Sequence, residues 1–310
     1  MGTSIVITSW NGKERLKISL PSIMHAWESH PEVIREIIVV DDASSDDTEE
    51  FLRLQFPQIR MIKNKQNRGF IYSSNKGVHE AREDIAVLLN NDVTVSNNFL
   101  DAVIPHFDDS SVFAVTFRSL GDDEKTFREG GKSMVFSLGF PHIRHALRHQ
   151  AENNKYSLYA VGGHCAVRKQ MFLALGGFDE LFHPGYWEDV DISWRAWKNG
   201  WKVLYEPESV VYHKEISTMK TSFKRFTLKT IKARNRLLFI WKNISSPFLM
   251  SEHIFFLVIR TVTSIITLDI YFYPALFSAL RLLPLVFKRR KTEEFNGNMS
   301  DRTTIRIGKD

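Results

Sequence analysis

Two stretches of sequence decide the fold: Ile37-Ile38-Val39-Val40-Asp41-Asp42 and Ile85-Ala86-Val87-Leu88-Leu89-Asn90-Asn91-Asp92. Each is a short apolar run that ends in acidic residues, which is typical of a buried strand in a parallel sheet. In an open sheet of this kind, ligands bind beyond the carboxyl ends of the strands. We therefore expect the two acidic ends to lie at one ligand-binding edge.

The chain around these stretches alternates short apolar runs with helical patterns. Strands are predicted at 4–8, 36–40, 60–63, 85–89 and 112–117, and helices at 14–29, 46–55, 70–81 and 97–106. This alternation indicates an α/β fold, with a mostly parallel sheet covered by helices on both faces. Residues 118–157 are polar and predict an excursion from the sheet. Beyond them we expect a strand at 158–167, a helix at 188–199, and strands near 202–205 and 209–212.

Charge is unevenly distributed along the 310 residues. The formal net charge is +5, but residues 1–213 carry −6 and residues 214–310 carry +11. With 43% hydrophobic and 25% charged residues, the composition excludes a disordered or collagen-like chain. The single cysteine, Cys165, excludes an intrachain disulfide. The basic C-terminal part predicts contact with an anionic surface, either a membrane or a nucleic acid.

The apolar stretch from Ile254 to Phe287 favours the membrane. Its longest charge-free run, 270–280, has 11 residues, whereas a membrane span needs about 20. A basic cluster at 288–291 follows and suits anionic headgroups. We predict helices that lie in the membrane interface. The alternatives are a true span, a hydrophobic dimer interface or a helical cap over the core. We expect no nucleic-acid partner, since no recognised nucleic-acid module is visible.

The turn after the first strand, residues 9–13, lacks the glycine pattern of a dinucleotide-binding domain, and the chain has no P-loop. A nucleoside diphosphate would therefore need a divalent cation, Mg²⁺ or Mn²⁺, with carboxylate, phosphate and water ligands. Asp92 suits the role of that carboxylate, and a histidine could be a further ligand of Mn²⁺. A turn or a helix cap explains Asp92 equally well.

Three carboxylates cluster at Glu188, Asp189 and Asp191. Their mutual repulsion tends to raise at least one pKa, which suits a general base. For Asp191 we favour the simpler interpretation, a helix start with an i,i+4 pair to Arg195. Asp189, at the mouth of that helix, is the candidate base. Trp187 beside it is a candidate acceptor-site residue.

Taken in order, these motifs resemble family 2 glycosyltransferases, especially the bacterial rhamnosyltransferase-like branch that builds cell-surface polysaccharides. The resemblance covers about residues 3–215 and is carried by Asp41-Asp42-Ala43-Ser44, Asn67-Arg68-Gly69-Phe70, Asn75-Lys76-Gly77, Asn90-Asn91-Asp92, Gly162-Gly163, Gly176-Gly177-Phe178-Asp179-Glu180 and Glu188-Asp189-Val190-Asp191 with Arg195. It implies a GT-A catalytic domain over 1–215. We expect a basic and apolar, membrane-associating helical extension over 216–291, and a flexible polar tail over 292–310.

The resemblance also implies roles for individual residues. Asp42, with Asp41 as its alternate, matches the acid that contacts the nucleoside, and Arg68 and Asn91 fall on the same nucleotide-sugar side. Asp92 matches the metal-binding acid, although Asn90 stands where many members have an acid. His213 matches a histidine that helps to coordinate the metal or the diphosphate. Asp189 matches the catalytic base, and three further residues fall on the acceptor side: Gly163, Trp187 and Glu188.

These matches predict a metal-dependent, inverting glycosyltransferase. It would move a sugar from a UDP- or dTDP-linked donor to a hydroxyl of a glycan or a lipid-linked acceptor. We expect it at the cytoplasmic face of the cell membrane, in cell-surface polysaccharide biosynthesis. A nucleotidyltransferase on a similar sheet and a non-catalytic, membrane-recruited binding module are the alternatives. The sequence makes no prediction of the oligomeric state.

Overall fold

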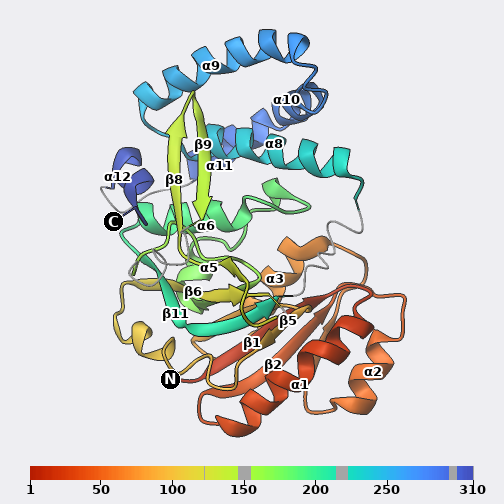
Figure 1. Cartoon of the computed structure of the whole chain (residues 1–310). Helices are drawn as coiled ribbons and strands as arrows, with labels where there is room; N and C mark the ends of the chain where they lie inside the picture. Colours follow the sequence, from red (N-terminus) through yellow and green to blue (C-terminus); the bar gives the residue numbers. More distant parts are fainter. Residues whose placement is uncertain (122, 146–154, 214–222, 293–298, 310) are drawn as a thin grey trace.

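The computed structural model describes residues 1–121, 123–145, 155–213, 223–292 and 299–309. Figure 1 shows an α/β layer built on a twisted sheet, with a second layer of helices above it and a long hairpin that reaches from one to the other. Residues 3–213 supply the strands of the sheet layer, and the helices of the upper layer come mostly from the C-terminal third of the chain.

The first part of the chain forms the predicted βαβ units. The strands are β1 (Thr3–Ser9), β2 (Ile34–Asp41), β3 (Arg60–Lys63) and β4 (Ile85–Asn90), and the helices are α1 (Lys13–Ser29), α2 (Thr48–Gln55) and α3 (Gly69–Glu80). Alternate residues of β2 face two different cores: Ile38 and Val40 pack with α3, whereas Ile37 and Val39 pack with α1. Helices therefore cover both faces of the sheet, as continuous apolar strands require.

The second part of the chain completes a mixed sheet. It adds β5 (Val93–Val95), β6 (Val112–Leu120), β7 (Phe127–Glu129), β10 (His164–Arg168) and β11 (Lys202–His213). Within the described ranges the strand order is β3-β2-β1-β4-β10-β6-β11-β5, and β7 pairs with β6. Strands β1 to β4 run parallel to one another, and β10 lies between β4 and β6 and runs antiparallel to both. The predicted α/β fold is confirmed.

Strand register places the acidic strand ends at one edge of the sheet. Asp41 pairs with Ser9 of β1, and Asn90 pairs with Thr8. At the far side, Tyr212 of β11 pairs with the end of β6, and His213 pairs with Val93 of β5. The residues that follow β2, β4, β6 and β11 therefore share this edge, which is the usual ligand-binding edge of an open α/β sheet.

The polar residues 118–157 hold more regular structure than the sequence indicates. Besides β7, they form the hairpin β8 (Lys132–Ser137) and β9 (Phe140–His145). The hairpin turn contacts helix α9 (Pro247–Ile266), where the carbonyl of Gly139 lies 2.7 Å from Nδ1 of His253. A Cβ atom at Gly139 would lie 2.8 Å from the Cα of His253, so only glycine allows this close approach.

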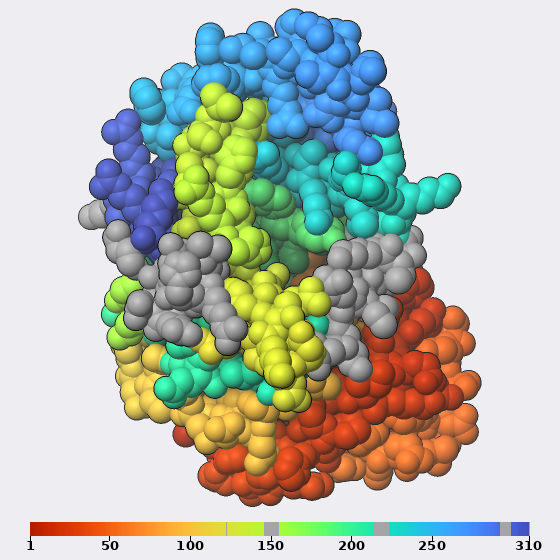
Figure 2. All heavy atoms as spheres, in the orientation of Figure 1, coloured from red at the N-terminus to blue at the C-terminus, as the bar shows by residue number. Residues whose placement is uncertain are grey.

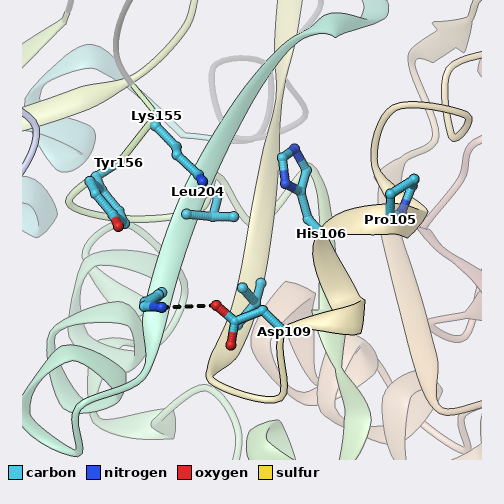
Figure 3. Close-up of a pocket in the computed structure, with 8 residues that line it drawn as sticks. Pro105, His106, Asp109, Lys155, Tyr156 and Leu204 are labelled. Atoms are coloured by element: carbon cyan, nitrogen blue, oxygen red, sulfur yellow. Dashed lines mark hydrogen bonds and ion pairs between the residues drawn. The ribbon is translucent and has the colours of Figure 1, made fainter.

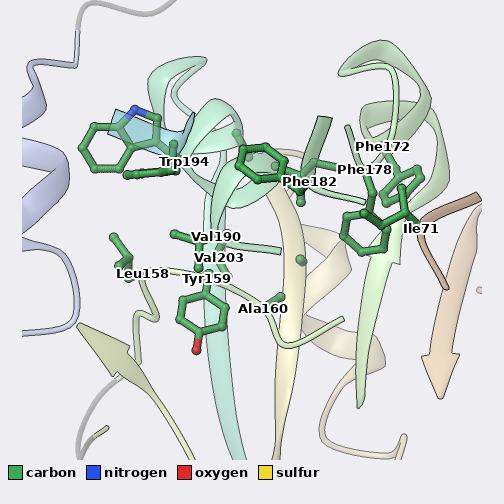
Figure 4. Packing of buried hydrophobic residues seen from close by; sticks show 14 of the residues in the cluster. Ile71, Leu158, Tyr159, Ala160, Phe172, Phe178, Phe182, Val190, Trp194 and Val203 are labelled. Atoms are coloured by element: carbon green, nitrogen blue, oxygen red, sulfur yellow. The ribbon is translucent and has the colours of Figure 1, made fainter. Parts of the chain in front are cut away.

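Helices of the upper layer share one hydrophobic core with the sheet layer. They are α6 (Glu188–Lys198), α8 (Arg225–Asn243), α9, α10 (Phe272–Arg281) and α11 (Leu283–Thr292). Phe239 of α8 packs edge-on against Trp194 of α6, with ring centroids 5.5 Å apart. Figure 4 shows Trp194, Val190 and Phe182 side by side in this core. The predicted boundary at 215/216 lies outside the described residues.

Three sequence-based predictions of secondary structure are wrong. Residues 97–106 form turns that lead into a short 3₁₀ helix at Ile104–Asp108, where an α-helix was expected. Only the last four residues of the predicted strand 158–167 lie in a strand, β10. The two strands expected at 202–205 and 209–212 are one strand, β11, which a shift of register between Glu206 and Val210 interrupts.

The end of the chain also departs from the prediction of a flexible tail, because residues 301–306 form helix α12 (Asp301–Arg306). The carboxylate of Asp301 is buried and lies 3.0 Å from Nζ of Lys198. It also accepts hydrogen bonds from the backbone N–H groups of Ser245 and Ser246. These contacts hold the end of the chain against α6 and against the start of α9.

An apolar face on α9 and α10 is exposed to solvent. Figure 2 shows these helices at the outer end of the molecule. By length and composition α9 is the described helix that could cross a membrane, and 17% of its most apolar stretch is buried. We call the following exposed side chains of α9 and α10, with the turn between them, the apolar face: Phe248, Ile254, Phe255, Val258, Ile259, Val262, Ile265, Ile266, Leu268, Ile270, Tyr273, Phe277 and Leu280.

A buried ion cluster around Asp191 joins α6 to α8. The Asp191 carboxylate is fully buried and accepts hydrogen bonds from Nε of Arg195 (2.9 Å), Nζ of Lys242 (2.9 Å) and Nδ2 of Asn243 (2.8 Å). Burial raises the pKa of Asp191, but the charges of Arg195 and Lys242 outweigh burial, so that the pKa is lowered from 3.8. The predicted pair with Arg195 is thus confirmed, as part of a buried cluster.

We expect Asp191→Asn to destabilise the fold by about 3–5 kcal/mol, since it removes the carboxylate that two buried cations share. Urea unfolding followed by circular dichroism measures this loss. Because the pKa of Asp191 is lowered, its contribution persists at neutral pH and is lost only as the pH falls below its ordinary 3.8. Glu14→Gln, which breaks an exposed ion pair with Lys17, should change stability by less than about 0.5 kcal/mol. Equal effects of the two variants would contradict the structural role of Asp191.

Candidate active site

The nucleotide-side residues predicted from sequence lie around the ends of β1, β2 and β4. Asp41 is buried at the end of β2, and its carboxylate accepts hydrogen bonds from the hydroxyl and the N–H of Ser44. Burial raises the pKa of Asp41 above its usual 3.8. Asn91, also buried, donates from Nδ2 to the hydroxyl of Ser9 at 3.0 Å. The structure thus brings Asp41 and Asn91 to the same edge, with Ser9 between their strands.

Asp42 acts on the backbone of the loop before α3. Its carboxylate accepts hydrogen bonds from the N–H groups of Arg68 (2.9 Å) and Gly69 (2.7 Å) and from Nδ2 of Asn64 (2.7 Å). Gly69 has a φ of +82°, a conformation that favours glycine. These bonds shape the Asn67-Arg68-Gly69 motif. The guanidinium of Arg68 lies over the ring of Tyr72 and 3.2 Å from the carboxylate of Glu180.

Asp92 and His213 come together across the pairing of β5 with β11. Nε2 of His213 lies 3.2 Å from Oδ1 of Asp92, although 121 residues separate them in sequence. Burial lowers the pKa of His213, but the hydrogen bond and charge of Asp92 outweigh burial and leave the pKa raised above 6.5. The His213 ring therefore interacts favourably with the negative charge of Asp92 although it is largely buried.

The donor set of this pair fits Mg²⁺ or Mn²⁺ held together with a diphosphate. Such ions take few protein ligands and complete their shell with phosphate oxygens and water. Among the described residues, no three His, Cys, Asp or Glu side chains gather closely enough to hold a metal by themselves. Asp92 and His213 would therefore hold the ion only together with the diphosphate and water.

The predicted base, Asp189, lies in the first turn of α6. The two residues before the helix, Tyr186 and Trp187, have φ values of +71° and +78°, a strained conformation for large side chains that is often found at functional sites. Oδ1 of Asp189 accepts a hydrogen bond from the N–H of Val190 at 2.8 Å. The ring of Trp187 packs against Phe239 of α8, with centroids 5.1 Å apart, so part of this candidate acceptor-site side chain serves packing.

The two adjacent carboxyl groups of α6 differ in their acidity. The pKa of Asp189 is raised from 3.8 to about 6. Burial is the main cause, and it outweighs the hydrogen bonds from the N–H groups of Val190 and Gly162, which lower the pKa. Glu188 is buried, and its Oε2 has no hydrogen-bond partner among the described residues. Burial and the charge of Asp189 raise the pKa of Glu188 well above 4.5. Asp189 is therefore the better proton acceptor at neutral pH.

Gly163 lies where two chain segments approach closely. A Cβ atom at this position would lie 2.3 Å from Nδ2 of Asn90, and the Gly163 carbonyl accepts a hydrogen bond from the N–H of Asn90 at 2.9 Å. The Gly162-Gly163 motif therefore connects the end of β4, which leads to Asp92, with the backbone that contacts Asp189.

Sequence reasoning missed three residues of this region: Glu129, Lys132 and His164. Lys132 has a fully buried side chain, and its Nζ lies 3.3 Å from Oε2 of Glu129. His164 is also buried, and its Nε2 lies 3.7 Å from the same oxygen. The ring of His164 lies 6.3 Å from that of His213. The one signal in the sequence is a charged pair on either side of Gly130-Gly131, which is common in loops and points to no particular chemistry.

Figure 3 shows a pocket elsewhere on the sheet, at the amino end of β11. An ion pair of 2.8 Å between Lys202 and Asp109 crosses it, and His106 and Tyr156 contribute to its lining. None of the predicted site residues lines this pocket. We therefore place the candidate active site at the carboxyl edge.

Solved structures with a similar fold are glycosyltransferases. GalNAc-T7 with UDP, GalNAc and Mn²⁺ aligns with a TM-score of 0.58 and 18% identity, over 78% of this chain and 48% of that one. TarS 1–349 of S. aureus with UDP-GlcNAc aligns with a TM-score of 0.58 and 16% identity, over 94% and 88% of the two chains. The predicted GT-A fold is thereby confirmed.

Curated relatives are glycosyltransferases too. The Pre-mycofactocin glycosyltransferase of Mycobacterium tuberculosis is 30% identical over 57% of this chain and 37% of its own length. The O-antigen chain rhamnosyltransferase WbaN of Salmonella anatum is 26% identical over 65% of this chain and 64% of its own length. The matched part spans only 35% of the probable N-acetylgalactosaminyltransferase 9 of Caenorhabditis elegans, which is 25% identical over 60% of this chain.

The match to the family model settles the classification. The model described as "Glycosyl transferase family 2" covers residues 4–176, which is more than half of the 310 residues. All the sheet-forming segments up to β10 and both glycine pairs, 162–163 and 176–177, fall within the match or at its border. The chain therefore belongs to glycosyl transferase family 2.

Proposed function

We propose that the protein is an inverting glycosyltransferase that transfers a sugar from a nucleoside-diphosphate donor to a hydroxyl group. The observation that carries this proposal is the pairing of Asp92 with His213 at the carboxyl edge of the sheet. Asp189, in the first turn of α6, is linked to this edge through the Gly162-Gly163 motif. The first two suit a metal-bound diphosphate, and Asp189 suits proton transfer. Membership of glycosyl transferase family 2 supports the same activity.

The chemistry follows from this arrangement. Asp189 takes the proton of the acceptor hydroxyl as its oxygen attacks the anomeric carbon of the sugar. The bond from that carbon to the diphosphate oxygen breaks on the opposite side, so the configuration inverts and the nucleoside diphosphate leaves with the bonding electrons. A divalent ion held by Asp92 and His213 would supply positive charge beside the leaving group. Asp41 and Asp42 would hold the nucleoside end of the donor, through the turn and the loop that they shape.

The finer identity of donor and acceptor is also proposed. We favour a UDP- or dTDP-linked sugar and a glycan or lipid-linked acceptor, in cell-surface polysaccharide biosynthesis. The similarity to the O-antigen chain rhamnosyltransferase WbaN and the fold shared with TarS support this choice. A nucleotidyltransferase would instead consume a nucleoside triphosphate and release pyrophosphate, and a non-catalytic module would turn over neither.

We further propose that the apolar face rests on the cytoplasmic surface of the cell membrane. Its side chains are exposed on one side of α9, while the other side is held by the hairpin and by α8, where Nε1 of Trp241 donates to His253. A helix held in this way suits a position in the membrane interface. Two of the basic residues predicted to meet headgroups contact the protein instead: Arg289 lies 3.4 Å from Asp179, and Arg290 donates to the Trp241 carbonyl.

The first test measures binding of UDP and dTDP by calorimetry with and without Mn²⁺. We expect Mn²⁺-dependent binding, and at least tenfold weaker binding by Asp92→Asn, since one of few metal ligands is lost. Asp101→Asn is the matched control, because Asp101 also pairs with a histidine, His30, but outside the site. Nucleotide binding that ignores both Mn²⁺ and Asp92→Asn would contradict the proposal, and pyrophosphate release from a nucleoside triphosphate would favour a nucleotidyltransferase.

The second test addresses Asp189 as the base. With a pKa of about 6, Asp189 is ionised above that pH, so kcat/KM should fall about tenfold per unit as the pH drops below it. Asp189→Asn should lower kcat by about 10²–10⁴-fold with unchanged nucleotide affinity. A pH–rate profile and single-turnover kinetics measure both effects. A variant with wild-type turnover would exclude Asp189 as the base.

The third test addresses the membrane. Val258→Gln with Val262→Gln replaces two exposed residues of the apolar face and should weaken sedimentation with phosphatidylglycerol vesicles more than tenfold, because each apolar side chain loses about 1.5 kcal/mol or more of burial. Leu54→Gln, at an equally exposed leucine on α2, should have no effect. Unchanged vesicle binding, together with a dimer that the double variant dissociates, would instead identify the apolar face as a dimer interface.

A further inference from the structure

Glu129 lies at the carboxyl edge of the sheet, on strand β7, which was not predicted from the sequence. Strand β7 runs antiparallel to the end of β6, and Glu129 pairs there with Ser119. Ser119 pairs on its other side with Val211, two residues before His213. The register thus places Glu129 on the strand that flanks β6, level with the end of β11 that carries His213.

Two buried side chains, Lys132 and His164, lie against the Glu129 carboxylate. Nζ of Lys132 lies 3.3 Å from Oε2 of Glu129 and 2.8 Å from Nδ1 of His145. Nε2 of His164 lies 3.7 Å from the same Glu129 oxygen. Within the described part of the chain these contacts fall on Oε2 of Glu129. A carboxylate has about four lone-pair sites on its two oxygens, so Glu129 can accept a further hydrogen bond from a ligand.

Glu129 carries a negative charge at neutral pH. Burial raises its pKa, but the nearby Lys132 and His164, together with the hydrogen bond from Lys132, outweigh burial and lower the pKa below 4.5. About a third of its side chain remains exposed, although that of Lys132 is fully buried. An ionised, partly exposed carboxylate is a strong hydrogen-bond acceptor.

Glu129 lies close to both halves of the candidate site. Its charge raises the pKa of Asp189 on α6. The His164 ring, whose Nε2 lies 3.7 Å from Oε2 of Glu129, lies 6.3 Å from the ring of His213 on β11. Glu129 therefore lies near the proposed base and near the proposed diphosphate site. In a transfer reaction the sugar occupies the space between these two.

His164 adds an independent observation. It is 2% exposed, and neither of its ring nitrogens has a hydrogen-bond partner within the described ranges. Burying such a group without a partner is costly, so a ligand hydroxyl is a fitting partner. His164 pairs with Leu89, the residue before Asn90 in β4, and thus lies at the same edge as Glu129.

We propose that Glu129 binds a hydroxyl group of the transferred sugar, with Lys132 as the positioning residue and His164 as a second contact of the sugar. This inference rests on the proposed function and deepens it, since it names the part of the donor that these residues recognise. A carboxylate repels the diphosphate, whereas sugar hydroxyls donate to it. The nucleoside end belongs to the opposite side of the edge, at Asp41 and Asp42.

The experiment compares two affinities in the presence of Mn²⁺. The probes are UDP and dTDP, and the one among UDP-glucose, UDP-N-acetylglucosamine and dTDP-rhamnose that most raises the melting temperature of the wild-type protein. Glu129→Gln should leave the affinity for the bare nucleoside diphosphate within about twofold. It should weaken binding of the nucleotide sugar by about tenfold to hundredfold, since a hydrogen bond to a charged group is lost.

Two further variants separate binding from folding. Glu129→Gln with Lys132→Met removes both charges of the buried pair, so no cation is left without its partner, and the sugar-specific loss should persist. Glu206→Gln is the matched control, because Glu206 is likewise paired with a histidine, His106, at 2.6 Å, and it should change neither affinity. His164→Leu should lower the affinity for the nucleotide sugar and spare the affinity for the bare nucleotide.

The outcomes distinguish this inference from the proposed function. Wild-type protein that binds no nucleotide with Mn²⁺ overturns both. Normal nucleotide binding, with Glu129→Gln and the double variant weakening both ligands equally or neither of them, overturns the sugar contact alone.

Discussion

The ion cluster around the buried carboxylate of Asp191 is the interaction on which the rest of the structure depends. This carboxylate accepts hydrogen bonds from Arg195 on its own helix and from Lys242 and Asn243 on α8. Arg195 also donates to the carbonyl of Gly177, and Lys242 lies 2.9 Å from Asp179. The glycine motif before α6, α6 itself and α8 are thus fixed to one another. Because Asp189 lies two residues before Asp191, the position of the candidate base depends on this cluster.

Around that fixed helix, the environment gives each carboxyl group a different state. Glu188 is buried without a cation and has a raised pKa, whereas Glu129, held by Lys132 and His164, has a lowered one. Asp189 lies between these extremes at about 6. Asp92 meets His213 across a strand pair. Four carboxyl groups near one sheet edge can therefore serve as a neutral buried group, a hydrogen-bond acceptor for the transferred sugar, a base and a metal ligand, because their neighbours differ.

Local patterns predicted the βαβ units well, since continuous apolar runs such as 37–40 are buried on both faces whatever lies around them. Asp189 was predicted from its cluster of neighbouring carboxylates and from its position in the family motifs, and His213 from its position in those motifs alone. Glu129 and Lys132 were not, because their meaning depends on β7 pairing with β6 and on the burial of a lysine, and neither feature leaves a periodic signal. The tail was misjudged for a similar reason: Asp301 becomes structural only through its distant partners Lys198, Ser245 and Ser246.

We propose that one sheet edge holds the diphosphate, the sugar and the base in that order. A crystal structure with Mn²⁺ and a bound nucleotide sugar would show whether it does. We expect metal density between the diphosphate and the Asp92–His213 pair, the sugar beside Glu129, and the carboxylate of Asp189 facing the anomeric carbon from the side opposite the diphosphate. A nucleotide bound away from Asp92, or a sugar whose anomeric carbon is out of reach of Asp189, would contradict this arrangement of diphosphate, sugar and base.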